Sequence, residues 1–189
     1  YDALYADLAG RYSDIKADSL TNEDGTIRWN IENKDFYKAF FEHILRPHEN
    51  IGVDFWWVDW QQWMIAQNEP NLGNTFWLNH VFFNDKKYHR WGGLGNHRYQ
   101  VGFSGDTFIS WASLDYQTYF NSTASNVLYG YWSHDIGGHN QEGANDAELY
   151  LRWIQYGVFS PILRTHATAA GHIERRIWKY ANFEQMRDA

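Results

Sequence analysis

The chain has 189 residues and a formal net charge of −7 at neutral pH. The acidic balance argues against a nucleic-acid partner, because proteins that bind the phosphate backbone present a basic face. The longest apolar runs hold four residues, which is too short to span a membrane, and the absence of cysteine excludes disulfides and thiol nucleophiles. The chain begins with Tyr1-Asp2-Ala3-Leu4, which resembles neither a start methionine nor a signal peptide, so we expect a piece of a longer protein of unknown compartment.

The first half of the chain predicts one helix and two strands. Asp35 is a candidate helix cap, an apolar stripe follows it, and Pro47 is expected to stop the helix. Residues 51–58 form a short apolar run rich in aromatic and β-branched side chains, which is typical of a strand buried on both faces. Residues 76–83 have the same character and predict a second strand.

The second half predicts an alternation of strands and helices. We expect strands at 99–103, 126–132 and 158–163, with the last one accommodating Pro161 near its end. A helix is expected over 107–124, and the capping-box spacing of Asn145 and Glu148 opens another that ends before Gly157. Strands that alternate with helices indicate βαβ units and a parallel sheet.

Polar side chains follow the predicted strands at the points where the strands end. Asp59 follows the first, Asp106 follows the strand at 99–103, and the segments 134–139 and 164–166 follow the last two. Because ligands bind at the carboxyl ends of parallel strands, these segments together are typical of an active site. Each aspartate taken alone would more often be a helix cap.

Other readings of the same segments are less well supported. Gly102-Phe-Ser104-Gly-Asp106 lacks the last glycine of a serine-hydrolase elbow, and the glycines at 92–95 lack the spacing of a phosphate loop. His134, Asp135 and His139 would be able to hold a metal, but no His-x-x-x-His pair or cysteine supports a metal site. Hydrogen-bonded loop side chains are the favoured interpretation, so we predict no metal and no cofactor.

Two carboxylates in different surroundings suit acid/base and nucleophilic work on acetals. Asp59 lies between Trp-Trp-Val and Trp60, whereas Asp106 stands at the opening of the next predicted helix. The helix dipole favours the ionised form of Asp106, so a general acid at this position needs a negative neighbour. An ionised Asp59 about 5–5.5 Å away would be that neighbour in a retaining glycosidase.

At these residues the sequence resembles glycoside hydrolase family 31, a family of retaining α-glucosidases and α-xylosidases built on a (β/α)8 TIM barrel. Residues 52–59 resemble its strand-four motif, which ends Trp-x-Asp, and residues 98–106 resemble its strand-six motif, which ends Gly-Asp. Residues 134–138 resemble its strand-seven loop, and residues 152–166 resemble the end of its strand eight. The resemblance covers about residues 50–178.

The resemblance implies a role for each matching residue. Asp59 would be the nucleophile, and Asp106 would be the acid/base. Trp60 stands where many members have methionine, and a side chain of its size would reshape the −1 subsite. Arg90 lies sixteen residues before Asp106, the spacing that the family uses for a sugar-contacting arginine. The substrate-binding set implied in this way comprises Trp57, Trp60, Arg90, Phe103, Asp135, His139 and His166.

The fold class implied is α/β, but a whole barrel takes about 250 residues. We therefore expect residues 1–189 to form a partial catalytic domain that runs from strand four to strand eight. Such a chain has unpaired strand edges, through which it would associate with other chains.

The function implied is α-glucosidase-like hydrolysis of α-linked oligosaccharides or glycosides, with a carbohydrate substrate and with neither a nucleic acid nor a membrane as a partner. Transglycosylation, or a preference for xylose, galactose or N-acetylgalactosamine, remains open on the same site. A non-catalytic carbohydrate-binding or scaffold protein is the alternative of another class. It rests on the aromatic share of 19%, since flat rings stack on sugar faces.

Overall fold

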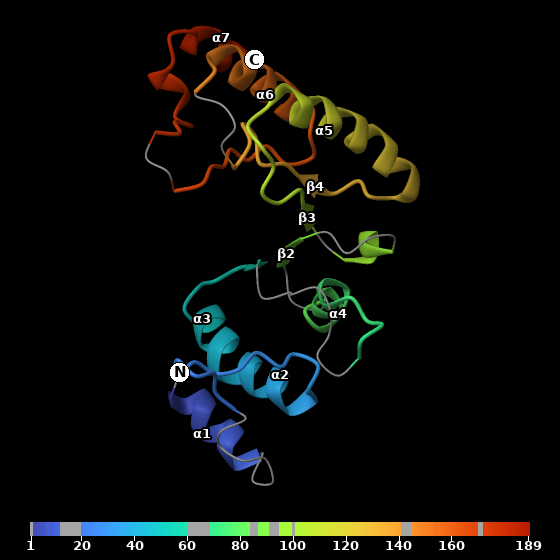
Figure 1. Ribbon diagram of the computed structural model, residues 1–189, viewed down its shortest axis with the longest axis vertical. Helices are drawn as coiled ribbons and strands as arrows, with labels where there is room; N and C mark the ends of the chain where they lie inside the picture. Colours follow the sequence, from blue (N-terminus) through green and yellow to red (C-terminus); the bar gives the residue numbers. More distant parts are fainter. Residues whose placement is uncertain are drawn as a thin grey trace. The chain divides into compact units, whose positions relative to one another are not determined.

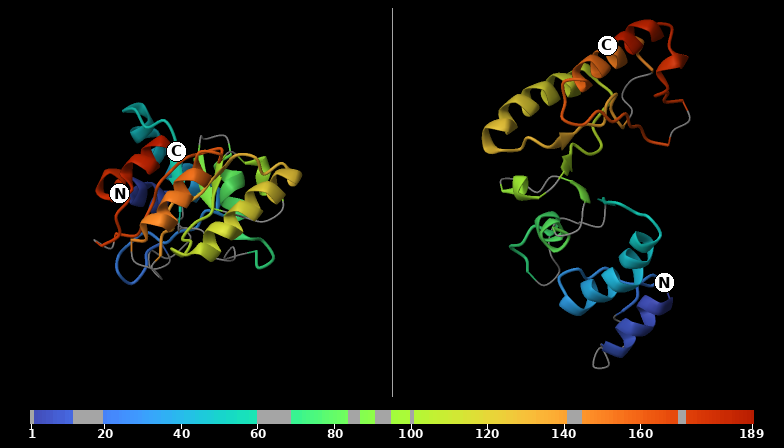
Figure 2. Two further views of the ribbon diagram at one scale, coloured as in Figure 1. Left: turned by 90° about the horizontal axis from the view of Figure 1, so that it is seen from above. Right: turned by 180° about the vertical axis from the view of Figure 1, so that it is seen from behind.

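A computed structural model of the protein describes residues 2–11, 20–59, 69–83, 87–90, 95–99, 101–140, 145–169 and 172–189. The chain forms two compact units, residues 1–87 and 88–189, and each is described by itself (Figures 1 and 2). Among the described residues, no helix combines the length and the apolar character that crossing a membrane requires.

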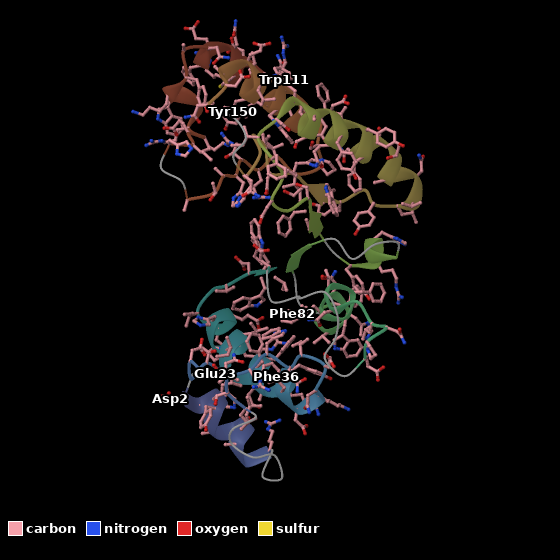
Figure 3. The ribbon with its side chains drawn as sticks, in the orientation of Figure 1. Asp2, Glu23, Phe36, Phe82, Trp111 and Tyr150 are labelled. Carbon is pink, nitrogen blue, oxygen red and sulfur yellow. The ribbon has the colours of Figure 1, made fainter. Side chains whose placement is uncertain are left out.

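The first unit is mainly helical. Its elements are α1 (Asp2–Arg11), α2 (Lys34–Phe40), the π-helix η2 (Phe41–Leu45), α3 (Arg46–Asn50), β1 (Trp56–Val58) and α4 (Asn74–Val81). Its core contains fully buried Leu8 and Leu78 together with buried Phe36 and Phe82. Figure 3 labels the two phenylalanines in this unit. Because rings from α2 and from the end of α4 meet in one cluster, these two helices hold the unit together.

The helix expected after Asp35 forms, but both of its predicted ends are wrong. Asn33 is the cap, because its side chain accepts the backbone N–H groups of Asp35 and Phe36. Pro47 does not stop the helix. It lies in the first turn of α3, where the missing N–H costs no hydrogen bond, and the wider turn of η2 leads into it.

The strand predicted at 76–83 is wrong, because these residues belong to α4 and the turn that follows it. Asn74, Leu78 and Phe82 are all buried, and their spacing of four residues is that of one helix face. The strand predicted at 51–58 is shorter than expected, since β1 starts only at Trp56. Gly52 has a φ of 115°, which places a turn where the strand was expected to begin.

The second unit contains the parallel sheet. Its elements are β2 (Lys87–Arg90), of which Lys87 belongs to the first unit, η3 (Asn96–Arg98), β3 (Val101–Phe103), α5 (Trp111–Ala124), η4 (Ser125–Val127), β4 (Trp132–Ser133), α6 (Ala147–Gly157), η5 (Ile177–Lys179) and α7 (Phe183–Asp188). Strands β2, β3 and β4 are parallel neighbours, with Arg90 opposite Phe103 and Phe103 opposite Ser133. The predicted parallel sheet is therefore confirmed.

Helices α5 and α6 lie side by side in the views of Figures 1 and 2 and contact each other. Trp153 of α6 and Ile136 of the loop after β4 are fully buried in the core of this unit. Asp146, rather than Asn145, caps α6 by accepting the N–H groups of Glu148 and Leu149. The two helices thus give a rigid backing to the segments that follow the strands.

The remaining strands of this unit are shorter than predicted. Residues 126–131 form a 3-10 helix and a turn, with Leu128 in the left-handed region, and only Trp132 and Ser133 are extended. Residues 158–163 form no strand, because α6 runs through Gly157 and ends in a turn. Two isolated parallel bridges, Ser133 to Ile162 and Ile136 to Thr165, mark the place of the predicted strand.

Candidate functional site

The segments that follow β3, β4 and the bridges at 162 and 165 meet at the carboxyl edge of the sheet in the second unit. The backbone N–H of His139 donates to the carbonyl of Thr107 over 2.8 Å, which joins the first two segments. The N–H of Thr168 donates to the carbonyl of His139 over 3.2 Å, which joins the third. Asp106, Asp135, His139 and His166 are carried into one site by these segments.

Asp135 lies at the buried centre of the site. Its side chain is fully buried, and Oδ1 forms an ion pair with the guanidinium of Arg164. Arg164 also donates to Ser133 Oγ over 3.2 Å and lies 5.6 Å from the ring centroid of Phe103. Burial raises the pKa of Asp135, and the positive charge of Arg164 acts in the opposite direction.

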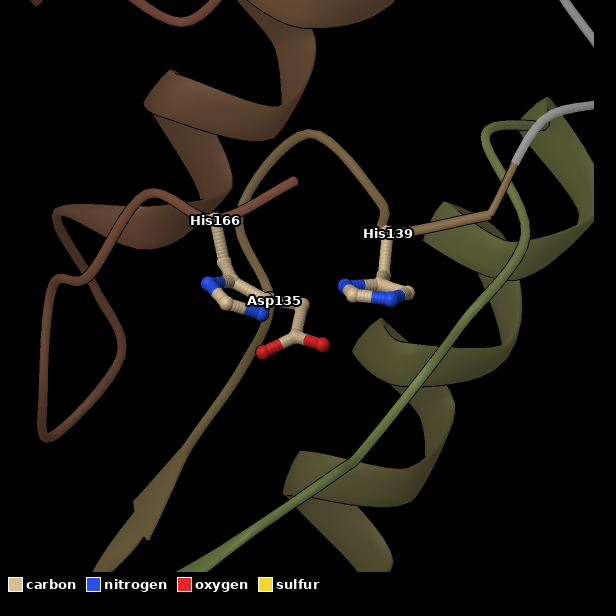
Figure 4. Close-up of side chains that lie close together, drawn as sticks. All are labelled: Asp135, His139 and His166. Carbon is tan, nitrogen blue, oxygen red and sulfur yellow. The ribbon is translucent and has the colours of Figure 1, made fainter. Parts of the chain in front are cut away.

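Two histidines stack beside Asp135. The rings of His139 and His166 have centroids 4.9 Å apart and planes 20° apart, and Figure 4 shows the Asp135 carboxylate next to both. Burial lowers the pKa of His166, which favours its neutral form. Nε2 of His139 lies 3.8 Å from Oδ1 of Asp106, which brings the predicted acid/base to the same cluster.

Two polar atoms of this site are buried without a hydrogen-bond partner among the described residues. They are Oδ2 of Asp135 and Nδ1 of His139. Buried polar atoms in folded proteins are nearly always paired, and an unpaired one costs free energy. These two atoms therefore call for a further polar partner, which the described residues do not provide.

The glycines of the loop after β4 allow this close arrangement. Gly137 and Gly138 have φ angles of 99° and 80°, a region that side chains other than glycine rarely adopt. A Cβ atom on Gly138 would lie 2.8 Å from the Cα atom of Ile109. The loop therefore needs both glycines in order to turn and to approach the segment after β3.

The cluster also has the composition of a transition-metal site. Asp135, His139 and His166 each offer one ligand atom within 4.8 Å of the others, and two histidines with one carboxylate suit such ions. Asp135 is already paired with Arg164, however, and that positive charge opposes a second cation. The arrangement fits a neutral ligand better than a metal ion.

His134, the other histidine of the predicted loop, has a different environment. Its ring is fully buried, with Nδ1 2.9 Å from Gln117 Oε1 and Nε2 2.7 Å from the hydroxyl of Tyr156. Burial lowers the pKa of His134 to about 3, so the ring is neutral near pH 7. His134 therefore ties β4 to α5 and α6, and His166 takes its place in the cluster of possible ligands.

The other predicted site residues belong to different parts of the chain. Trp57 and Asp59 lie at the end of β1 in the first unit, where Trp57 is 39% exposed and Asp59 is half-buried. Arg90 is the last residue of β2, but its side chain, like the whole of Trp60, lies outside the described residues.

Sequence reasoning missed one residue that supports the site. Arg175 lies behind the loop after β4, and its guanidinium contacts the carbonyls of Gly137, Gly138 and His166. No motif or spacing in the sequence points to it, because its partners are backbone atoms.

Comparison with known protein families matches nearly the whole chain. Residues 18–189 match the model of the glycosyl hydrolases family 31 TIM-barrel domain. The chain belongs to glycosyl hydrolases family 31. The family assignment and the barrel fold expected from the sequence are thus confirmed.

Relatives within family 31 differ in the substrates that their names indicate. An α-xylosidase of Saccharolobus solfataricus is 38% identical over 71 residues, which cover 36% of this chain and 10% of that protein. A sulfoquinovosidase of Escherichia coli is 26% identical over 125 residues, covering 63% of this chain and 18% of that protein. The matched part is thus less than a fifth of either relative.

Solved structures of family 31 share the fold. A family 31 α-xylosidase from a soil metagenome, solved with xylose, has a TM-score of 0.62 at 20% identity and covers 80% of this chain and 27% of its own. A glucosidase II α subunit has a TM-score of 0.67 at 16% identity, and the match covers 94% of this chain and 24% of that subunit.

Proposed function

We propose that this chain carries the catalytic residues of a retaining α-glycoside hydrolase. The proposal is supported above all by the family 31 match over residues 18–189, together with the cluster of Asp135, His139 and His166, which lies beside Asp106 and has unpaired buried polar atoms. Such atoms are suited to binding sugar hydroxyls. In this proposal the chain runs from barrel strand four to strand eight, and residues 1–189 form part of the catalytic domain.

The reaction would proceed by two displacements. Asp59 attacks the anomeric carbon while Asp106, as a carboxylic acid, gives its proton to the leaving oxygen. The bond to that oxygen breaks, and a glycosyl ester on Asp59 forms. Asp106, now a carboxylate, takes a proton from water as the water oxygen attacks the anomeric carbon and releases Asp59. No group other than the two carboxylates is required for the proton balance.

The nucleophile is tested by covalent trapping in the full-length protein that contains this chain. A fluorinated α-glycosyl fluoride forms an ester that hydrolyses slowly, and peptide mapping then locates the label. We expect the label on the peptide that contains Asp59. A label on a peptide without Asp59 would contradict the assignment.

The acid/base is tested with substrates of different leaving groups. Asp106→Ala should slow the hydrolysis of an unactivated disaccharide on the order of 100-fold or more, because general acid catalysis typically contributes 10²–10⁴. An aryl glycoside with a good leaving group needs little protonation and should lose far less in its bond-cleavage step. An equal loss for both substrates would mean that Asp106 is not the acid.

The sugar preference is a separate part of the proposal. The names of the relatives indicate both xylosidase and sulfoquinovosidase activity, and α-glucosidase-like activity is our proposal for this chain. A panel of aryl α-glycosides decides between glucose, xylose, galactose and N-acetylgalactosamine. Product analysis at high substrate concentration distinguishes hydrolysis from transglycosylation. Trp57, Trp60, Phe103 and Arg90 remain predicted substrate contacts in this scheme.

A further inference from the structure

Arg175 has an unusual set of partners for a half-buried cation. Its Nη2 donates to the carbonyls of Gly137 and Gly138 over 2.7 and 2.8 Å, and its Nε donates to the carbonyl of His166 over 2.9 Å. Its Nη1 donates to the carbonyl of Glu174 over 2.8 Å. Burial lowers the pKa of Arg175, but arginine stays protonated in proteins, so a full charge is held here by carbonyl dipoles.

These carbonyls belong to the two segments that carry the site. Gly137 and Gly138 lie between Asp135 and His139, and the third carbonyl is that of His166 itself. One planar guanidinium therefore links the loop after β4 to the segment of His166, in addition to the backbone hydrogen bonds that Ile136 exchanges with Arg164 and His166. The distance between the two segments determines how the rings of His139 and His166 stack and where both lie relative to Asp135.

Arg175 is itself held in place from the other side. The hydroxyl of Tyr150 on α6 donates to the carbonyl of Arg175 over 2.8 Å, and the guanidinium lies 5.0 Å from the centroid of the same ring. A Cβ atom on Gly137 would lie 2.5 Å from Nε of Arg175, so the loop approaches the guanidinium as closely as glycine permits. The guanidinium of Arg175 is thus closely packed, against Tyr150 on one side and against the loop after β4 on the other.

We infer that Arg175 is a positioning residue that sets the geometry of Asp135, His139 and His166 by clamping the two segments that carry them. Its effect on activity rests on the proposed glycosidase function. Lysine cannot replace it, because an ammonium group is a compact point charge without the planar fork that reaches several carbonyls at once. The neighbouring Arg176 is the matched control, since it is exposed and pairs with Glu174 instead.

The first test measures the site directly in the 189-residue chain. NMR signals of the His139 and His166 imidazoles are compared in the parent, Arg175→Lys and Arg176→Lys. Relative to the parent, we expect the chemical shifts of both imidazoles to change in Arg175→Lys and to remain the same in Arg176→Lys. Unshifted signals in a folded Arg175→Lys chain would overturn the inference. Should Arg175→Lys fail to fold, Tyr150→Phe removes the hydroxyl that holds the backbone carbonyl of Arg175 and keeps the charge of the guanidinium, and the same signals decide.

The second test measures catalysis in the full-length protein. Arg175→Ala should lower kcat on the order of 100-fold, because misplacing reacting groups by about 1 Å costs that much, while Arg176→Ala keeps the parent activity. Added guanidinium ion should restore part of the kcat of Arg175→Ala but not of Asp106→Ala. Unchanged kcat in Arg175→Ala would overturn the inference. If the parent hydrolyses no glycoside, the proposed function fails, while the imidazole signals still decide the role of Arg175.

Discussion

Burial acts in opposite directions on two neighbouring residues of the loop after β4. It raises the pKa of Asp135 and lowers that of His134 to about 3, in both cases by disfavouring the charged form. Asp135 has Arg164 as an ion-pair partner, whereas His134 contacts the neutral side chains of Gln117 and Tyr156. The charge of this loop is therefore borne by Asp135, and His134 acts as a neutral link to the helices.

The buried state of His134 predicts how stability depends on pH. Between about pH 6.5 and pH 3 the unfolded chain binds a proton at His134 that the folded chain excludes, so the free energy of unfolding falls as the pH is lowered. One such group contributes a slope of at most about 1.4 kcal/mol per pH unit. Urea unfolding at several pH values should give a smaller slope for His134→Gln than for the parent.

The urea unfolding experiment has an internal control in the data at higher pH. Above the ordinary pKa of histidine, His134 is neutral in both the folded and the unfolded chain, so the two proteins should show parallel pH dependences there. Equal slopes in the acidic range as well would mean that His134 takes up its proton in the folded state.

Sequence alone predicts some of the site residues and misses others for a physical reason. Asp106, Asp135 and His139 follow strands, and the parallel sheet brings together whatever follows its strands. Arg175 follows no strand, and its partners are carbonyl groups that every residue possesses, so no pattern of residue types marks it. His134 was grouped with possible ligands because spacing does not tell which way a loop side chain points.

At the scale of elements, the turn between η4 and β4 holds a residue in an unfavourable conformation. Leu128 has a φ of 65° and is 76% exposed. The left-handed region costs a residue with a Cβ atom roughly 1–2 kcal/mol, and asparagine tolerates it better than leucine. Because the Leu128 side chain is exposed, its burial does not compensate for this cost. The turn is therefore less stable with leucine than it would be with a residue that tolerates the left-handed region.

Replacing this leucine should therefore change stability in a direction set by the new side chain. Leu128→Asn should raise the free energy of unfolding by about 0.5–1 kcal/mol, because part of the left-handed penalty is removed. Leu128→Val should lower it, since a branched Cβ fits this region least. Urea unfolding at constant pH measures both, and an equal stability of the Asn and Val variants would contradict the assigned backbone conformation.

The elements also show where apolar patterns mislead. The apolar run at 76–83 predicts a strand, yet a short apolar run does not distinguish a strand from a buried helix. What decides is tertiary packing, because α4 buries Leu78 in a core built by α2 and its neighbours. By contrast, the helix predicted over 107–124 forms as α5, which starts four residues later than predicted, after the cap Ser110.

At the scale of the whole molecule, the two units have separate cores and many exposed rings. The second unit exposes large apolar side chains, among them Phe159 at 87%, Tyr119 at 67% and Trp178 at 63%. Surface rings of this kind, together with unpaired strand edges, promote association with other chains. A chain that carries part of a barrel is expected to have such edges.

We therefore expect the isolated chain to associate with itself. Sedimentation velocity over a range of concentrations should show a weight-average mass that rises above the monomer. Phe159→Asp replaces the most exposed of these rings by a charge and should reduce this rise in mass. The free energy of unfolding should stay nearly unchanged, because surface substitutions usually change it by no more than about 0.5 kcal/mol. A single monomeric species at every concentration would contradict this expectation.

The boundary between the two units falls inside β2, between Lys87 and Tyr88, and not in a loop. Tyr88, His89 and Arg90 pair with Val101, Gly102 and Phe103, so the strand is joined to the second unit along its length. A shortened gene for the second unit has to start no later than Tyr88 to preserve this pairing. One that started after Arg90 would leave β3 with an open edge near Asp106. Both versions lack Asp59, so a lower free energy of unfolding, and not lost activity, would report damage to the sheet.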